Sequence, residues 1–391
     1  MEGNFVFEGK LKQISIVLSL LAVIALGVSF GMNHYVGWVD YLVFALYFTT
    51  VSVSSIFFLS LAGVLQASWL TPYKRIPEAM SGFLPYAAGL MLISIAGMGA
   101  NYEWTHADIV QNDPILSAKV AWLNTPRFVG TMAFILIVWN LIALRHKKVS
   151  EMMDGSNGAE VARKNMGFFA VSILVFALTI SCAAFDWIMS VEPHWFSTIF
   201  GVYIFAGTFV SGMAFITLTV ITLKEQGYLK NVNENHLHDL GKWMFGMSVF
   251  WAYIWISQYL LIWYANVPEE TEYYVLRHHH WNGLFFFNVV INFVFPFFVL
   301  MTRKAKRNAT VLKTVAAVLL VGHFLDMYIM VAPKIFHHHD VHHVSGFGVV
   351  QILQLLGGFG FFIFIVGRAL SKRKLEVTSD PTYAEGAHLH Q

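Results

Sequence analysis

Two aspartates, Asp186 and Asp326, are the residues with the clearest capacity for chemistry, because each lies inside a long apolar run. Placing a charged side chain at the centre of a bilayer costs about 2.5–3.5 kcal/mol or more. Such residues are retained for a proton or ion pathway, or as one half of a buried pair. We interpret both as candidate proton-carrying groups. The alternative is that each hydrogen-bonds a neighbouring helix and only holds the bundle together.

Both aspartates occur in the same local pattern. Asp186 precedes Pro193 by seven residues and Asp326 precedes Pro333 by seven residues, in each case at the end of an apolar run. A duplicated four-helix unit would place both aspartates at a similar depth in the outer part of the membrane. Chance similarity between two short segments is the alternative. The pattern favours duplication.

The neighbours of each aspartate suggest how a proton would reach it. Thr179, Cys182 and Ser190 follow the helical spacing of Asp186 and share its face, which predicts a polar stripe able to hold water. His323 lies three residues before Asp326 and also shares its face. A histidine beside a carboxylate can pass a proton on near neutral pH.

Three further kinds of polar residue are candidates at the outer side. Gln258 and Tyr259 lie within an apolar, tryptophan-rich run, where they could line a polar cavity with either aspartate or form helix–helix contacts. The histidine runs 278–280 and 337–339, with His342 and His343, lack the spaced ligands of a shaped metal site. We therefore expect a docking surface for a periplasmic partner there, and no metal site.

The sequence predicts no redox cofactor bound by this chain. It has one cysteine and no C-x-x-C-H segment, so it cannot hold an iron–sulfur cluster or attach a c-type haem. His323 is the only histidine well inside an apolar run, whereas a b-type haem needs two facing histidines.

The elements that carry these residues are predicted to be membrane-spanning helices. The chain has 391 residues, of which 57% are hydrophobic and 12% charged, against about a quarter charged in soluble domains. A span needs about 20 apolar residues. The continuously apolar runs indicate an all-α integral membrane protein, with one polytopic domain over 1–391 and about ten spans, at 13–33, 39–65, 82–100, 127–144, 166–190, 197–223, 243–265, 282–301, 310–331 and 347–369.

The duplication predicts how these spans are grouped. We expect two parallel four-helix bundles, formed by residues 39–190 and 197–331, with peripheral helices at 13–33 and 347–369. Residues 372–391 form a polar tail that we expect to be mobile.

The charges between the spans predict the orientation. Lysine and arginine concentrate in alternate loops and at both ends of the chain. The opposite side has only Lys119, Arg127, Arg277 and Lys334. By the positive-inside rule both termini and the tail are cytoplasmic.

At three segments the chain resembles a known family. The segments are 185–198 (FDWIMSVEPHWFST), 238–246 (HDLGKWMFG) and 257–266 (SQYLLIWYAN). They resemble the F subunits of bacterial alternative complex III, which belong to the polysulfide-reductase-anchor (NrfD-like) membrane proteins. The resemblance extends over nearly the whole chain.

The resemblance implies a role in respiration at the bacterial inner membrane. The complex is a quinol oxidoreductase that passes electrons to a periplasmic cytochrome c or directly to an oxidase. The implied partners are lipids, the sister C subunit, the iron–sulfur protein, the cytochrome c subunits and a terminal oxidase in a supercomplex, with no nucleic acid. Haem c and iron–sulfur clusters would lie in those partner subunits, and menaquinol or another quinol is the implied substrate. The implied proton path comprises Asp186, Glu192, His194, His323 and Asp326.

Three functions remain open from the sequence. The first is a subunit without redox centres that conducts protons within a quinol oxidoreductase. The second is a subunit that binds quinol itself near the outer face. The third is a stand-alone proton-coupled secondary transporter, which parallel repeats and the lack of paired broken helices disfavour.

Overall fold

Ten helices of the computed structural model are long and apolar enough to cross a membrane. The model describes residues 5–155, 157–341, 346–376, 380 and 382–389, and no strand occurs among them. These findings confirm an all-α, multi-span membrane protein. The spans are Gly9–Met32, His34–Leu65, Arg75–Asn101, Thr125–Met153, Met166–Val191, Phe200–Glu225, Glu234–Ala265, Asn282–Leu300, Ala309–His338 and Val349–Leu370.

Seven of the spans contain one uninterrupted α-helix each. They are α1 (Gly9–Met32), α2 (His34–Leu65), α8 (Thr125–Met153), α11 (Phe200–Glu225), α12 (Glu234–Ala265), α16 (Ala309–His338) and α17 (Val349–Leu370). Shorter helices connect the spans: η1 (Ser68–Tyr73), η3 (Glu103–Thr105), α6 (Ala107–Asn112), α7 (Pro114–Ala118), α9 (Gly158–Lys164), α13 (Pro268–His280) and η7 (Ala305–Arg307). One more short helix, α18 (Tyr383–Ala387), follows the last span.

The other three spans change helix type along their length. The third comprises α3 (Arg75–Ser81), α4 (Leu84–Ser94), η2 (Ile95–Gly97) and α5 (Met98–Asn101). The fifth comprises α10 (Met166–Ala183), η4 (Ala184–Ile188) and η5 (Met189–Val191), and the eighth α14 (Asn282–Val289), η6 (Val290–Val294) and α15 (Phe295–Leu300). The segments η4 and η6 are π-helices, which occur frequently at functional sites. Asp186 lies within η4.

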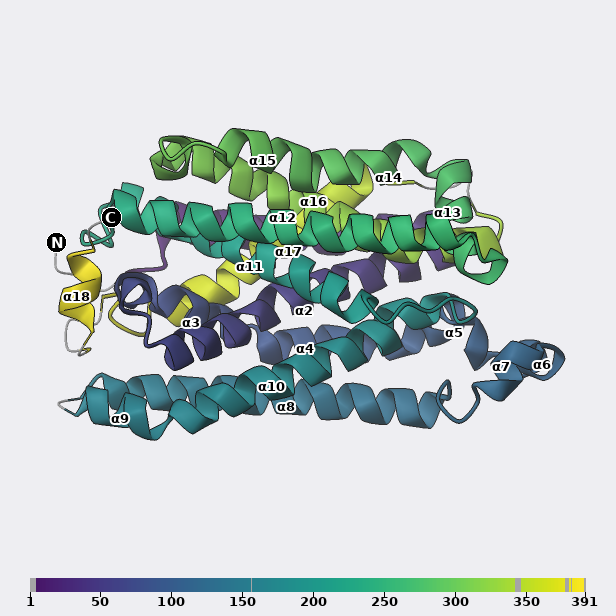
Figure 1. The fold of residues 1–391 in the computed structure, drawn as a ribbon, viewed down its shortest axis with the longest axis horizontal. Helices are drawn as coiled ribbons and strands as arrows, with labels where there is room; N and C mark the ends of the chain where they lie inside the picture. The colour runs from purple at the N-terminus through teal and green to yellow at the C-terminus, as the bar shows by residue number, and fades with distance from the viewer. Residues whose placement is uncertain (1–4, 156, 342–345, 377–379, 381, 390–391) are drawn as a thin grey trace.

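The spans run side by side along the long axis of the molecule (Figure 1). The helices α3, α9 and α18 lie at one end of the bundle, whereas α6, α7 and α13 lie at the other. We refer to these as the α18 end and the α13 end. The expected orientation would place the α18 end in the cytoplasm.

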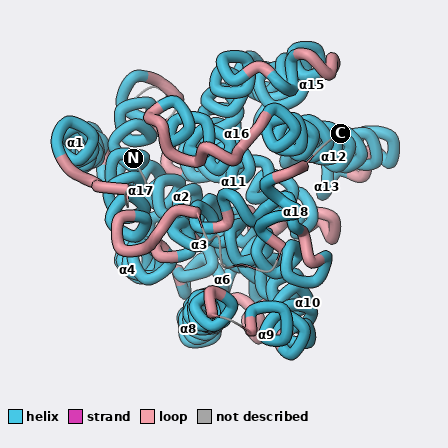
Figure 2. The backbone as a smooth tube through the Cα atoms, turned by 90° about the vertical axis from the view of Figure 1, so that its left-hand side faces the viewer, coloured by secondary structure: helices cyan, strands magenta, loops and turns pink. Residues whose placement is uncertain are grey.

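Three helices form the centre of the bundle. In the most apolar stretches of α2, α11 and α16, 94%, 78% and 83% of the residues are buried, and the three helices pack on one another. Figure 2 shows α8, α9 and α10 on one flank and α12 and α15 on another, with α1 and α17 together at an edge. Small residues allow that edge pair to approach closely, since a Cβ at Gly357 would lie 2.4 Å from the backbone nitrogen of Ala22.

The grouping into two separate four-helix bundles remains a prediction. The helix α2 packs on α4 and α10 of the first predicted repeat, but also on α11 and α16 of the second.

The described part of the tail is ordered, which corrects the expectation of mobility. The helix α18 packs on η1, and Asp380 pairs with Lys74 at 2.5 Å. The backbone carbonyl of Leu389 accepts hydrogen bonds from Asn233 and Asn235. The physical reason is that the tail supplies partners to buried polar groups at the α18 end.

Candidate functional site

The candidate site is centred on Asp326 in α16, whose side chain is buried among neutral donors. Its carboxylate accepts hydrogen bonds from the Tyr203 hydroxyl, from Trp251 Nε1 at 3.1 Å and from Asn288 Nδ2 at 2.6 Å. These donors come from α11, α12 and α14. Among the described residues no lysine or arginine forms an ion pair with Asp326. The groups that donate hydrogen bonds to Asp326 are therefore all neutral dipoles.

His323 lies one helical turn before Asp326 and is equally buried. Its Nδ1 atom is 4.0 Å from Asp326 Oδ2, and its ring meets the Trp251 indole edge-on at 5.6 Å between centroids. Neither ring nitrogen has a hydrogen-bond partner among the described residues. A buried imidazole in this state is expected to bind water, because buried polar atoms are almost always hydrogen-bonded.

Two small cavities border the Asp326 side chain, one on each side along the bundle. Each has a volume of about 10 Å³, which is about the space of one water molecule. The first is lined by His323 with Thr50, Thr208 and Ser211, and the second faces the α13 end. Thr208 Oγ1 also lacks a hydrogen-bond partner among the described residues. Asp326 thus lies between two polar sites that can each hold water.

Gln258 in α12 belongs to this site, whereas Tyr259 does not. Gln258 lines the second cavity, donates from Nε2 to the Tyr274 hydroxyl at 3.1 Å and accepts from Ser197 at 3.3 Å. The Tyr259 hydroxyl instead lies 3.3 Å from His278 Nε2, at the rim of the α13 end.

Glu192 is paired with a buried arginine next to this site. Glu192 Oε1 accepts from Arg277 at 2.7 Å, and the Arg277 side chain is fully buried. Arg277 also donates to the carbonyls of Ile329 at 3.1 Å and Met330 at 2.9 Å. Pro333 has no N–H group to bond the Ile329 carbonyl within α16, so Arg277 satisfies an acceptor that the proline leaves free.

Asp186 has a different environment from Asp326 despite the matching sequence pattern. Its two oxygens accept from the Arg127 guanidinium at 2.6 and 3.0 Å, and the Arg127 head group also lies over the Trp122 ring at 4.0 Å. An arginine is always charged in proteins, so Asp186 faces a permanent cation. Thr179 of the predicted polar stripe bonds Trp139 at 2.9 Å instead of lining a path to Asp186.

His194 lies at the surface of the α13 end, away from Asp326. Its Nε2 atom is 2.5 Å from Asp113 Oδ2. Asp113 also caps α7 by accepting from the backbone N–H groups of Ile115 and Leu116. The hydrogen bonds from Leu116 and from His194 lower the pKa of Asp113 below its usual value.

Sequence reasoning placed the two arginines among the outer loop charges and thereby missed their roles. Both are bonded to carboxylates of the predicted proton path, Arg127 at the start of α8 and Arg277 in α13. A usable signal was the helical spacing of Arg277 after Tyr273 and Tyr274, which puts three large polar side chains on one face of a short helix.

A third buried carboxylate, Asp40, was also missed because it lies near the start of its apolar run. Its side chain is 1% exposed and accepts from Ser29 at 2.6 Å, Gln351 at 3.0 Å and Gln354 at 3.2 Å. It therefore links α2 to the edge pair α1 and α17.

The described histidines of the α13 end are not gathered into a metal site. No group of three or more histidine, cysteine, aspartate or glutamate side chains with ligand geometry occurs in the described part of the chain. His339 stacks on Tyr35 at 3.6 Å, and His338 lies 3.1 Å from Glu103. The predicted docking histidines His342 and His343 lie outside the described residues.

Comparisons with known proteins add no family to this geometry. No protein-family model and no curated protein matches the sequence.

Proposed function

We propose that this chain is a membrane subunit of a respiratory quinol oxidoreductase of the alternative complex III type, and that it conducts protons through Asp326. The observation that carries the proton path is a buried carboxylate without a paired lysine or arginine, bordered on two sides by water-sized cavities. The resemblance of segments 185–198, 238–246 and 257–266 supports the complex.

A proton relay needs a group that is stable both with and without its proton. The donors around Asp326 are neutral, so they can support the anion without fixing it as a permanent cation would. His323 and the water sites provide proton donors and acceptors on one side, and Gln258 and Tyr274 provide them on the other. The path therefore covers the part of the bundle between His323 and the α13 end.

The other members of the predicted path have supporting roles in this proposal. Asp186 and Glu192 each face an arginine, and a buried pair of this kind holds helices in register more readily than it exchanges protons. His194 with Asp113 lies where a path would reach the outer solvent.

The chain is proposed to bind no redox cofactor of its own. Haem c and iron–sulfur clusters would be held by partner subunits of the complex, namely the iron–sulfur protein and the cytochrome c subunits. We place the chain in a bacterial inner membrane with both termini in the cytoplasm. The two outer cations Arg127 and Arg277 are engaged in ion pairs, which leaves the α13 end with still fewer free positive charges.

The geometry disfavours quinol binding beside Asp326. A cavity of about 10 Å³ holds one water molecule and no aromatic ring.

Replacement of Asp326 tests the proposal. In the purified complex reconstituted in liposomes, Asp326→Asn is expected to lower the number of protons released per electron while quinol oxidation continues in uncoupled vesicles. Asp340→Asn, at an exposed position just after the same helix, is the matched control. An unchanged proton-to-electron ratio in an assembled Asp326→Asn complex would falsify the role of Asp326.

A further inference from the structure

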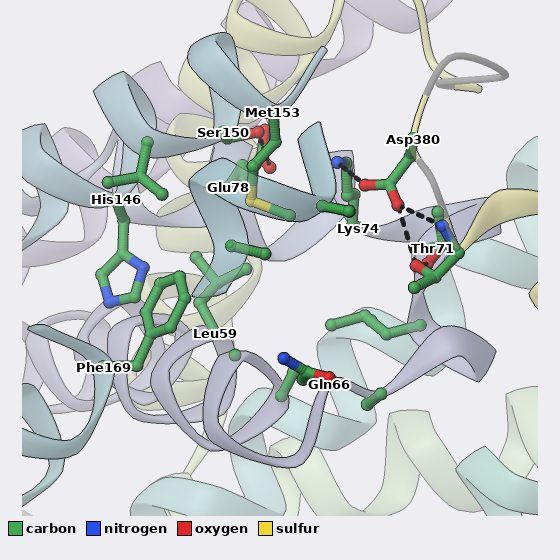
Figure 3. Close-up of a pocket in the computed structure, with 18 of the residues that line it drawn as sticks. Leu59, Gln66, Thr71, Lys74, Glu78, His146, Ser150, Met153, Phe169 and Asp380 are labelled. Carbon is green, nitrogen blue, oxygen red and sulfur yellow. Dashed lines mark hydrogen bonds and ion pairs between the residues drawn. The ribbon is translucent and has the colours of Figure 1, made fainter. Parts of the chain in front are cut away.

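A cavity with a volume of about 210 Å³ lies at the α18 end, and Asp326 is not among the residues that line it. Figure 3 shows this cavity. It is formed by the end of α2, η1, α3, the end of α8, α9 and α10. Its surface is mostly apolar, with side chains such as Leu59, Leu70, Val149, Met153 and Phe169. The proposed proton path uses none of these residues.

The charged groups inside the cavity are already paired. Lys74 lies 2.5 Å from Asp380, and a dashed line marks this ion pair in Figure 3. Glu78 accepts from Arg75 at 2.6 Å and from Ser150 at 2.5 Å. The interior therefore offers an apolar surface with internally satisfied charges, and it has no free ion for a charged ligand group to neutralise.

The rim is different, because it carries an exposed arginine, Arg163, whose acidic neighbour Glu160 is bonded to Lys164. Arg163 in α9 and the side chain of Gln66 at the end of α2 line the cavity and are exposed. Neither side chain forms a hydrogen bond or ion pair with a described residue, whereas the adjacent Lys164 pairs with Glu160 at 2.7 Å. The rim can thus bind an anion.

The cavity extends along α2 from the α18 end of the bundle towards its middle. Its wall on α2 extends from Gln66 to Leu59, which is about 10 Å along a helix at 1.5 Å per residue. Gly63 allows Phe169 to close one side, since a Cβ there would lie 2.5 Å from that ring. An occupant would have its anionic group at the rim and its apolar part along the bundle axis.

We propose that this cavity binds an anionic phospholipid from the leaflet at the α18 end. The phosphate lies on Arg163 and Gln66, and an acyl chain covers the apolar wall. Arginine and lysine side chains near the cytoplasmic surface of a membrane attract acidic head groups. A guanidinium is well matched to phosphate oxygens because it offers several N–H donors in one plane. The inference is independent of proton conduction.

Lipid retention measured by native mass spectrometry tests the site. The full chain, with any subunits that accompany it, is exchanged into phosphatidylglycerol or phosphatidylcholine of identical acyl chains. We expect at least tenfold preferential retention of phosphatidylglycerol. Arg163→Gln is expected to bring the ratio close to one, whereas Lys148→Gln, which removes an exposed charge outside the cavity, leaves the ratio unchanged.

Filling the cavity separates a lipid site from a surface charge effect. Ala162→Leu is expected to abolish retention of both lipids while the melting temperature stays close to that of the wild type. Equal retention of the two lipids, or a preference that persists in Arg163→Gln, overturns the proposal. Displacement of the lipid by inorganic phosphate alone would indicate a site for free anions. Displacement of the lipid by a neutral quinone would indicate a quinone site. Either result also overturns the proposal.

Discussion

Asp326 Oδ2 and His323 Nδ1 lie 4.0 Å apart on one face of α16, both buried and not hydrogen-bonded to each other. A donor–acceptor separation of this length is too great for a direct hydrogen bond but suits a bridging water. Asp186, which has the same sequence pattern, is bonded through both oxygens to Arg127. The same sequence pattern thus produces one carboxylate bonded to neutral donors and one paired with a guanidinium.

The fold is expected to lose stability when one partner of the Asp186–Arg127 ion pair is removed and the other stays. Arg127→Gln leaves a buried, uncompensated carboxylate and should lower the free energy of unfolding by roughly 3 kcal/mol, at the low end for buried pairs because Arg127 is partly exposed. The double variant Arg127→Gln/Asp186→Asn should recover most of this loss. Thermal unfolding in detergent measures both, and equal losses in the single and double variants would contradict the pairing.

Asp40 is expected to hold the edge pair α1 and α17 on α2 by hydrogen bonding. Asp40→Leu leaves the Gln351 and Gln354 amides without their acceptor, and each buried donor left unpaired costs about 1–3 kcal/mol. Asp40→Asn keeps a side-chain oxygen and should be milder. Hydrogen exchange in α17 reports the effect. Equal protection of α17 in the Leu and Asn variants would argue against this role.

The docked tail is expected to depend on pH through Asp380. Burial raises the pKa of this carboxyl, but the Lys74 ammonium and the hydrogen bonds from Thr382 outweigh burial and hold the pKa below its usual value. A lowered pKa in the folded state means that the stabilisation is present above the usual pKa and is lost as the pH falls through the lowered one.

Hydrogen exchange of α18 measured against pH checks this expectation. Protection of α18 should fall only under strongly acidic conditions in the wild type. Lys74→Met removes the cation, so the loss should begin at a higher pH. Identical profiles for the two proteins would show that the ion pair does not hold the tail.

The expected orientation, with the α18 end in the cytoplasm, predicts which side of the membrane each loop faces. The sequence has a single cysteine, Cys182, so Cys182→Ala provides a background for labelling. In intact cells, Asp108→Cys should react with a membrane-impermeant maleimide. Lys148→Cys should react only after the membrane is opened. Both positions are exposed in the structure. The reverse pattern would place the α18 end outside.

The sequence by itself determined the membrane-spanning character, the number of spans and the positions of Asp186 and Asp326. The reason is that apolar run length and the cost of burying charge depend on local composition, which can be read along the chain. The sequence did not distinguish Tyr259 from Gln258, because both are polar residues in one apolar run.

Only the tertiary structure decided which partner each carboxylate meets. Asp186 and Arg127 are separated by 59 residues, and Glu192 and Arg277 by 85, so their pairing depends on how distant helices pack. Asp326 meets Tyr203, Trp251 and Asn288 from three other helices. Because helix packing sets the partners of a buried carboxyl, two aspartates that looked equivalent in the sequence have different surroundings once the helices are assembled.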